Sequence, residues 1–321
     1  MFVEAALTAA TAAPTSPAGP GQVSATRPGL AHRLRGAAPP YLYLLPALAC
    51  LVLWTYKPLV EAAQLSVYHW NLLPTSPKTY VGLANFQRVL QLPQLRGAAL
   101  NTLWYVLGLL PFSIVLPTVI ALVTRRLGER SRTAYRAMVF VPMLVAPVAT
   151  AAVWRWLYDP SGLLNRLFGL GDHNWLREES TALPAVLAIC AWQMLGFAVL
   201  VVSAGLSGIS PDYAEAAEMD GASRWQILRW ITLPLLRPTL LFMLLMTVLL
   251  SGQWTFPLID VLTQGGPADS TTNVYYLLWE FGFRSMDSGL ASAAGLVFFG
   301  CFGLLAAGLV KLADRFSFHD D

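Results

Sequence analysis

Two long apolar runs of this 321-residue chain contain a few polar and aromatic side chains that could bind a small polar molecule. They are Trp192 and Gln193 in one run, and Ser251, Gln253, Trp254 and Asp260 in a later one. Polar groups inside a membrane are costly, so they face a cavity or bond to another helix. An amide beside an aromatic ring suits a sugar or polyol, and the sequence leaves pathway and helix–helix roles open. Asp260 would repel a phosphate, so we expect it at a gate or an interface.

A polar stretch between the same two runs, residues 215–238, predicts two short helices joined at a glycine. Ser210 can cap free amides and Pro211 fits the first helical position, so the first helix should span about 211–219. Gly221 then permits a sharp change of direction.

The second short helix is expected to start at Ser223, because Gln226 follows it at capping-box spacing. Pro234 and Pro238 are expected to limit that helix. Helices this short are marginal in water alone, so the pair is expected to pack against a partner.

No arrangement of residues predicts catalysis or a bound cofactor in this chain. The three lysines, Lys57, Lys78 and Lys311, do not lie in the phosphate-binding pattern of a P-loop. The four histidines and three cysteines are scattered without metal-ligand spacing, so we expect no metal site. No convergent titratable groups favour a membrane enzyme. Any ATP and Mg²⁺ should therefore bind to another polypeptide.

The composition predicts an all-α membrane protein. Hydrophobic residues make up 56% of the chain and charged residues 12%, about half the share in soluble domains. Six runs approach the roughly 20 residues that a membrane-spanning helix needs. They lie at about 41–63, 99–123, 137–157, 183–206, 238–261 and 288–311. The small net charge of +3 gives no indication of a nucleic-acid partner.

The basic residues predict the orientation. An arginine cluster within residues 125–136 marks the cytoplasmic side, which places both termini and the polar loop at 207–237 in the cytoplasm. Residues 1–39 are rich in Ala, Pro, Thr, Ser and Gly and predict a disordered cytoplasmic tail. A six-helix domain is then expected at 40–315, followed by a short cytoplasmic tail at 316–321.

The polar loop resembles a known motif. Its segments Glu215-Ala216-Ala217 and Asp220-Gly221-Ala222, followed by Ile231, Leu233 and Pro234, match the EAA loop of permease subunits of bacterial binding-protein-dependent ABC importers. The resemblance implies the type I importer permease fold, in which this cytoplasmic loop is a coupling helix docked on an ATPase subunit. It implies that Glu215 contacts the ATPase, that Ala216 and Ala217 allow close approach, and that Gly221 sets the angle.

The resemblance extends over nearly all of the chain after residue 40. The segments 41–71, 80–90, 136–165, 263–283 and 288–295 are similar to those of carbohydrate-type permeases. The Gly265-Gly266-Pro267 turn implies a loop that meets an extracytoplasmic binding protein, although such a turn can occur anywhere. Residues 256–260 with 263–272 look most like the glycerol-3-phosphate permease subunit.

The resemblance implies a non-catalytic transport subunit in the bacterial inner membrane. Its partners would be a second permease subunit, an ATPase dimer and a solute-binding protein, with membrane lipid around it. The solute would be a sugar or a glycerol-3-phosphate-like or glycerophosphodiester-like molecule, and a different sugar or a disaccharide is the alternative. An ion-coupled secondary transporter would need charged residues buried within its spans, and these runs hold almost none away from their ends.

Overall fold

The computed structural model describes residues 43–125 and 127–316, so the predicted tail at 1–39 and nearly all of the one at 316–321 lie outside it. The chain divides into two units, Met1–Pro58 and Leu59–Asp321, which we describe separately. The described part of the first unit is helical throughout and includes a π-helical turn at Val52–Tyr56. All other elements below belong to the second unit, apart from the start of α2.

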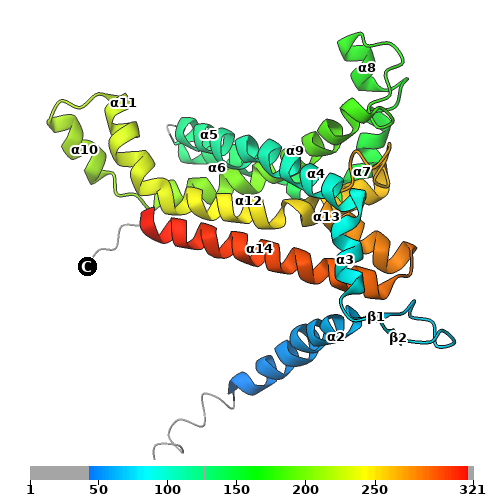
Figure 1. The fold of residues 1–321 in the computed structure, drawn as a ribbon. Coiled ribbons are helices and arrows are strands. Elements are labelled where there is room, and N and C mark those ends of the chain that lie inside the picture. Colours follow the sequence, from blue (N-terminus) through cyan, green and yellow to red (C-terminus); the bar gives the residue numbers. More distant parts are fainter. Residues whose placement is uncertain (1–42, 126, 317–321) are drawn as a thin grey trace, which may run out of the picture. The chain divides into compact units, whose positions relative to one another are not determined.

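Helices dominate the second unit, as the sequence predicts (Figure 1). The helices are α2 (Lys57–Leu65), α3 (Ala84–Gln91), α4 (Pro93–Leu110), α5 (Leu116–Thr124), α6 (Glu129–Leu144), α7 (Pro147–Leu157), α8 (Leu163–Phe168), α9 (Glu179–Ser207), α10 (Asp212–Met219), α11 (Arg224–Ile227), α12 (Leu233–Leu262), α13 (Val274–Trp279) and α14 (Ser288–Phe316). Further π-helical turns lie at Pro111–Val115, Leu228–Thr232 and Glu280–Arg284.

Five helices of the described chain are long and apolar enough to cross a membrane. They are Tyr43–Leu65, Pro93–Thr124, Glu179–Ser207, Arg224–Leu262 and Ser288–Lys311, and a bent pair of helices supplies a sixth candidate. Five of the six predicted spans are therefore present as single helices, and the bent pair covers the remaining one. Most of the helices extend beyond the predicted limits, because backbone hydrogen bonding continues into polar residues that a hydropathy criterion leaves out.

The third predicted span, 137–157, is not one straight helix. Its two parts, Arg130–Leu144 and Pro147–Leu157, meet at 92°. Pro147 begins α7 and disfavours helical geometry in the residue before it, and Ala146 is extended (φ −56°, ψ 137°). The hydropathy of this run predicts a single helix. The backbone preference that Pro147 imposes on Ala146 breaks the run into two helices instead.

Pro234 and Pro238 do not limit the second short helix, contrary to the expectation. The helix runs without a break from Arg224 to Leu262 through both prolines. A π-helical turn at Leu228–Thr232 immediately precedes Pro234, and Pro117 in the second span follows another such turn. The wider turn accommodates a residue that lacks an amide donor and crowds the preceding turn.

Helix α9 lies at the centre of the packed core. More than half of its most apolar window is buried, and α5, α6 and α12 pack against it. Helix α6 approaches so closely that a Cβ added at Gly196 would lie 2.2 Å from the Val139 carbonyl oxygen. Glycine is therefore the one residue type that allows α6 to pack this closely against α9.

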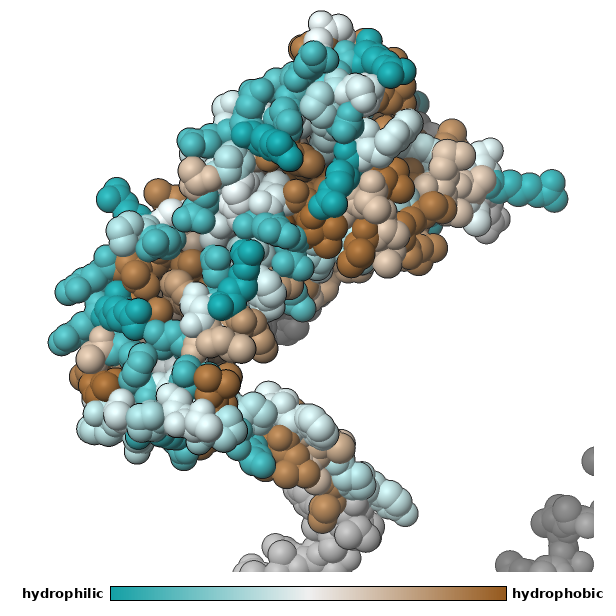
Figure 2. All heavy atoms as spheres, turned by 90° about the vertical axis from the view of Figure 1, so that its right-hand side faces the viewer, coloured by the Kyte–Doolittle hydropathy of each residue, from teal (hydrophilic) through white to brown (hydrophobic). Residues whose placement is uncertain are grey.

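A short antiparallel ribbon, which the sequence did not predict, adds the only sheet found in the described residues. Its strands are β1 (Tyr68–His69) and β2 (Thr79–Tyr80). Figure 2 faces the end of the unit that carries this ribbon, α8 and the loop after α12, and shows hydrophilic side chains over much of it. A polar surface fits segments that project beyond the hydrocarbon layer.

Candidate functional site: a cavity and an exposed helical loop

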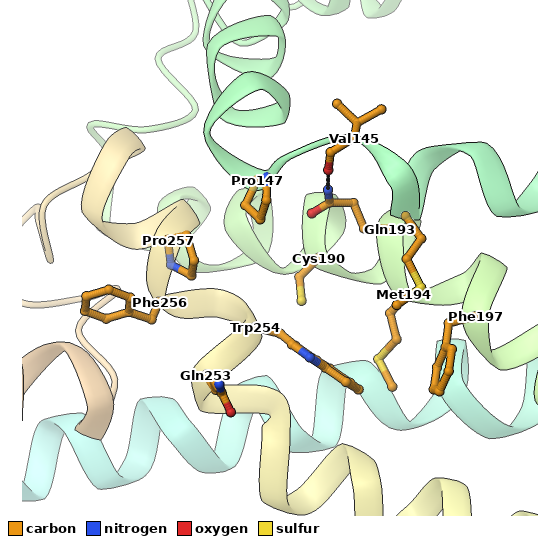
Figure 3. A pocket seen from close by; sticks show the side chains of 11 residues that line it. Val145, Pro147, Cys190, Gln193, Met194, Phe197, Gln253, Trp254, Phe256 and Pro257 are labelled. Carbon is orange, nitrogen blue, oxygen red and sulfur yellow. Dashed lines mark hydrogen bonds between the residues drawn. The ribbon is translucent and has the colours of Figure 1, made fainter. Parts of the chain in front are cut away.

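A cavity of about 420 Å³ lies between α9, α12 and the bend that joins α6 to α7 (Figure 3). Helix α9 contributes Cys190, Gln193, Met194 and Phe197, which recur on one helical face. Helix α12 contributes Gln253, Trp254, Phe256 and Pro257, and the bend contributes Met143, Val145 and Pro147. This volume falls within the range of about 300–1,000 Å³ that is common for small-ligand sites.

The bend positions one of the two cavity amides. Because the helix breaks after Leu144, the Val145 carbonyl lacks a helical partner and accepts a hydrogen bond from Gln193 Nε2 at 3.3 Å (Figure 3). The same Nε2 donates to Thr150 Oγ1 at 3.0 Å. Gln193 thus joins α9 to both sides of the bend, and its carbonyl oxygen is left for other partners.

The other cavity amide is free. Gln253 is exposed and has no hydrogen-bond partner within the described part of the chain, and Trp254 lies beside it. None of the residues that line the cavity carries a charge. The cavity therefore offers amides, aromatic faces and a thiol, which can bind a neutral hydroxylated molecule. An anion would enter without a counter-charge from this chain.

The structure brings together three of the six predicted pathway residues, namely Gln193, Gln253 and Trp254. The others do not line the cavity. Trp192 packs edge-to-face on Trp154 at 5.7 Å, the buried Ser251 has an unpartnered Oγ, and Asp260 is half-buried near the end of α12.

The sequence analysis did not single out Cys190, Met194 or Phe197. Their spacing around Gln193 places all four residues on one helix face, a signal that could have identified them.

The predicted binding-protein loop after α12 is firmly held. Gly265 is buried at φ +86°, and an added Cβ there would lie 2.5 Å from Thr272 Oγ1. Asn101 Nδ2 donates to the carbonyl oxygens of Asp269 and Thr272, each at 3.0 Å. Gly266 and Pro267 are half-buried, and the tip at 268–269 is exposed. Gly265 therefore shapes the loop, and the tip is left open to solvent.

The polar loop forms the two predicted helices, α10 and α11, at the end of the unit opposite α8 (Figure 1). Gly221 turns the chain at φ +83°. The predicted capping box is present: Gln226 N donates to Ser223 Oγ at 3.4 Å, and Ser223 N donates to Gln226 Oε1 at 2.7 Å. The turn and the start of the second helix are therefore confirmed.

The surface of this loop is rich in exposed apolar side chains. Of the predicted coupling residues, Glu215, Ala216, Asp220 and Gly221 are exposed, and Ala217 and Ala222 are half-buried. Four large side chains of residues 213–230 that the sequence did not indicate are also exposed: Tyr213 (57%), Met219 (89%), Trp225 (64%) and Trp230 (70%). The loop therefore combines exposed apolar side chains with the exposed carboxylates of Glu215 and Asp220.

Two polar contacts order the segment after α7. The Tyr158 hydroxyl donates to the Ala185 carbonyl at 3.1 Å, and burial raises the pKa of this phenol well above its usual value. Asp159 Oδ1 accepts hydrogen bonds from the hydroxyl and the amide of Ser161, which lower the pKa of that exposed carboxyl group. Both groups therefore keep their usual charge at neutral pH.

Several proteins of known type resemble this chain. A probable ABC transporter permease of Pyrococcus horikoshii is 33% identical over 72% of this chain and 80% of its own length. The trehalose/maltose transport system permease MalF of Thermococcus litoralis is 31% identical (81% and 88%). The sn-glycerol-3-phosphate transport system permease UgpA of Pectobacterium atrosepticum is 27% identical (86% and 93%).

The fold has a solved counterpart. A chain of a bacterial ABC transporter that imports the acidic polysaccharide alginate superposes with a TM-score of 0.77 at 24% identity. The match covers 88% of this chain and 97% of the other, and shows the type I permease fold. The family model of binding-protein-dependent transport system inner membrane components matches residues 92–317. The chain therefore belongs to this family and is a non-catalytic ABC transporter permease.

Proposed function

We propose that this chain forms half of the translocation pathway of an importer for a neutral sugar or polyol. The uncharged cavity, which offers the free amide of Gln253 beside the indole of Trp254, carries the proposal. An indole can cover an apolar sugar face while an amide bonds to hydroxyls. The relative named for trehalose and maltose transport supports the same solute class.

A glycerol-3-phosphate-like solute is the second candidate. The relative named for glycerol-3-phosphate transport, which matches 86% of this chain, favours it. A phosphate in this cavity would need its counter-charge from another subunit, because the lining residues of this chain carry none.

The exposed α10–α11 loop gives this permease a docking surface for a separate ATPase. Met219 and Trp225 offer apolar contact area, and Glu215 offers a carboxylate beside them. ATP-driven closure of an ATPase pair would move this loop as a rigid body and tilt the long helix Arg224–Leu262, which continues from α11 to the cavity. The loop would face the cytoplasm, and the loop tip at 268–269 would meet a binding protein on the other side.

Uptake by cells that express the whole importer tests the proposed solute. Replacing Trp254 by Ala should raise KM for a transported sugar about tenfold, because it removes a stacking face from the pathway. Uptake of glycerol 3-phosphate by the unaltered importer, with no uptake of a panel of mono- and disaccharides, would contradict the neutral-sugar proposal. Replacing Trp156, an exposed indole outside the cavity, by Ala is the matched control.

A further inference from the structure

A second cavity, of about 280 Å³, lies among α5, α6, α9 and the segment that leads into α10. It shares no residue with the solute cavity. Arg125, Arg132 and Arg136 line it, together with the hydroxyl-bearing Ser203 and Ser207 of α9. Three arginines thus line one cavity, and neither the solute pathway nor the docking loop accounts for it.

Two buried polar atoms of this cavity have no partner. Ser203 is 1% exposed, and neither its Oγ nor the buried Nε of Arg136 forms a hydrogen bond. The neighbouring Ser207 hydroxyl is already bound to the Ser203 carbonyl at 2.8 Å. Buried polar atoms are satisfied in most native structures, because leaving one unpaired is costly. These two atoms therefore point to a ligand that accepts hydrogen bonds.

The charge of the site defines the ligand further. Among the side chains that the structure describes, none of the three arginines has a carboxylate within ion-pairing distance. Guanidinium groups bind phosphate through paired N–H donors, and a serine hydroxyl can donate one more bond. We propose that this cavity binds the phosphate group of a mono- or diester.

Two sources can supply such a group at this position. The cavity lies at the end of α5 and α9 that also carries α10, where apolar helices meet polar residues (Figure 1). A phosphodiester headgroup of an anionic phospholipid lies at this depth of a bilayer, and basic pockets between spanning helices bind such headgroups. A free phosphate ester or inorganic phosphate would reach the same arginines from the aqueous side.

The first arm of the test measures lipid. The full-length chain is placed in nanodiscs made from equal amounts of phosphatidylcholine and phosphatidylglycerol, and retained lipids are counted by native mass spectrometry. The Arg132→Gln/Arg136→Gln variant should retain phosphatidylglycerol about a hundredfold less well, since each of the two lost charged hydrogen bonds costs roughly a factor of ten. Ser203→Ala should weaken retention about threefold, and because its hydroxyl has no partner, the substitution leaves protein contacts intact.

The second arm measures a soluble ligand. The same proteins, in nanodiscs of phosphatidylcholine alone, are titrated with inorganic phosphate. Arg237→Gln is the matched control, because it removes one exposed arginine that borders neither cavity. Loss of phosphatidylglycerol retention supports a lipid source, and loss confined to the phosphate titration supports a soluble one. Equal binding by wild type, both cavity variants and the control in both arms would overturn the proposal.

Discussion

Replacing Gln193 by Leu tests whether the amide of this residue holds helices together, in contrast to the free amide of Gln253. Leu has about the volume of Gln but cannot donate to Val145 O or Thr150 Oγ1, which accept at 3.3 and 3.0 Å. Each hydrogen bond contributes about 0.5–1.5 kcal/mol, and membrane helix contacts average nearer 0.6. The loss should therefore be about 1–3 kcal/mol of unfolding free energy, because the carbonyl at the bend is also left without its partner.

Gln253→Leu is the matched control within the same cavity. Gln253 makes no hydrogen bond to the described chain, so its replacement should change stability by less than about 0.5 kcal/mol. The same change should raise the KM of transport, because Gln253 is the amide left free for solute. Gln193→Leu is thus expected mainly to lower the free energy of unfolding, whereas Gln253→Leu is expected mainly to raise KM.

The assay is unfolding in mixed detergent and SDS micelles, followed by tryptophan fluorescence. Thr150→Val, which removes one acceptor of Gln193, completes a double-mutant cycle and should show a coupling free energy of about 1 kcal/mol. Wild-type stability for Gln193→Leu, or additive losses in the cycle, would refute the structural role. An equal loss of stability in Gln253→Leu would refute the assignment of that amide as free.

Three more predictions follow from other contacts. Gly221→Asp should leave the chain inserted in the membrane, because nothing lies within 4 Å of an added Cβ, but it should abolish uptake by altering the turn at φ +83°. Membrane fractionation and an uptake assay check this, and normal uptake would count against the coupling role. Gly196→Leu should lower the amount of folded protein in gel filtration, because its Cβ would meet the Val139 carbonyl at 2.2 Å, whereas Gly300→Leu, which has open space, should not. Asn273→Ala should lower the free energy of unfolding by about 2–4 kcal/mol, measured by thermal unfolding, because it removes three hydrogen bonds. Asn273 Nδ2 donates to Gly252 O and Thr255 Oγ1, and its Oδ1 accepts from Tyr276 N, at 2.7–2.9 Å. An unchanged melting temperature would show that these bonds contribute nothing.

The sequence predicted the elements whose signals are local. Apolar runs of sufficient length identified the spans, and the spacing of Ser223 and Gln226 identified the start of α11. The sharp turn at Gly221 followed from the absence of a side chain. Each of these signals lies within one continuous stretch of the chain, which is why sequence alone was enough.

The sequence could not show which polar groups meet across helices. Gln193 and Thr150 are 43 positions apart, and their bond joins α9 to the first turn of α7, just after the break at Pro147. Ser251 looked equivalent to Gln253, but helical rotation buries the first and exposes the second. Such distinctions depend on tertiary packing, as does the gathering of three arginines and Ser203 around one cavity.

Photo-crosslinking from the α10–α11 loop tests the central claim most directly. A photoreactive residue at Met219, which is 89% exposed, would be activated in membranes that contain the whole importer. The account predicts a covalent adduct with the nucleotide-hydrolysing subunit, and no labelling of Met219→Cys by a membrane-impermeant thiol reagent added outside intact cells. Labelling from outside, or adducts that never include an ATPase, would contradict it.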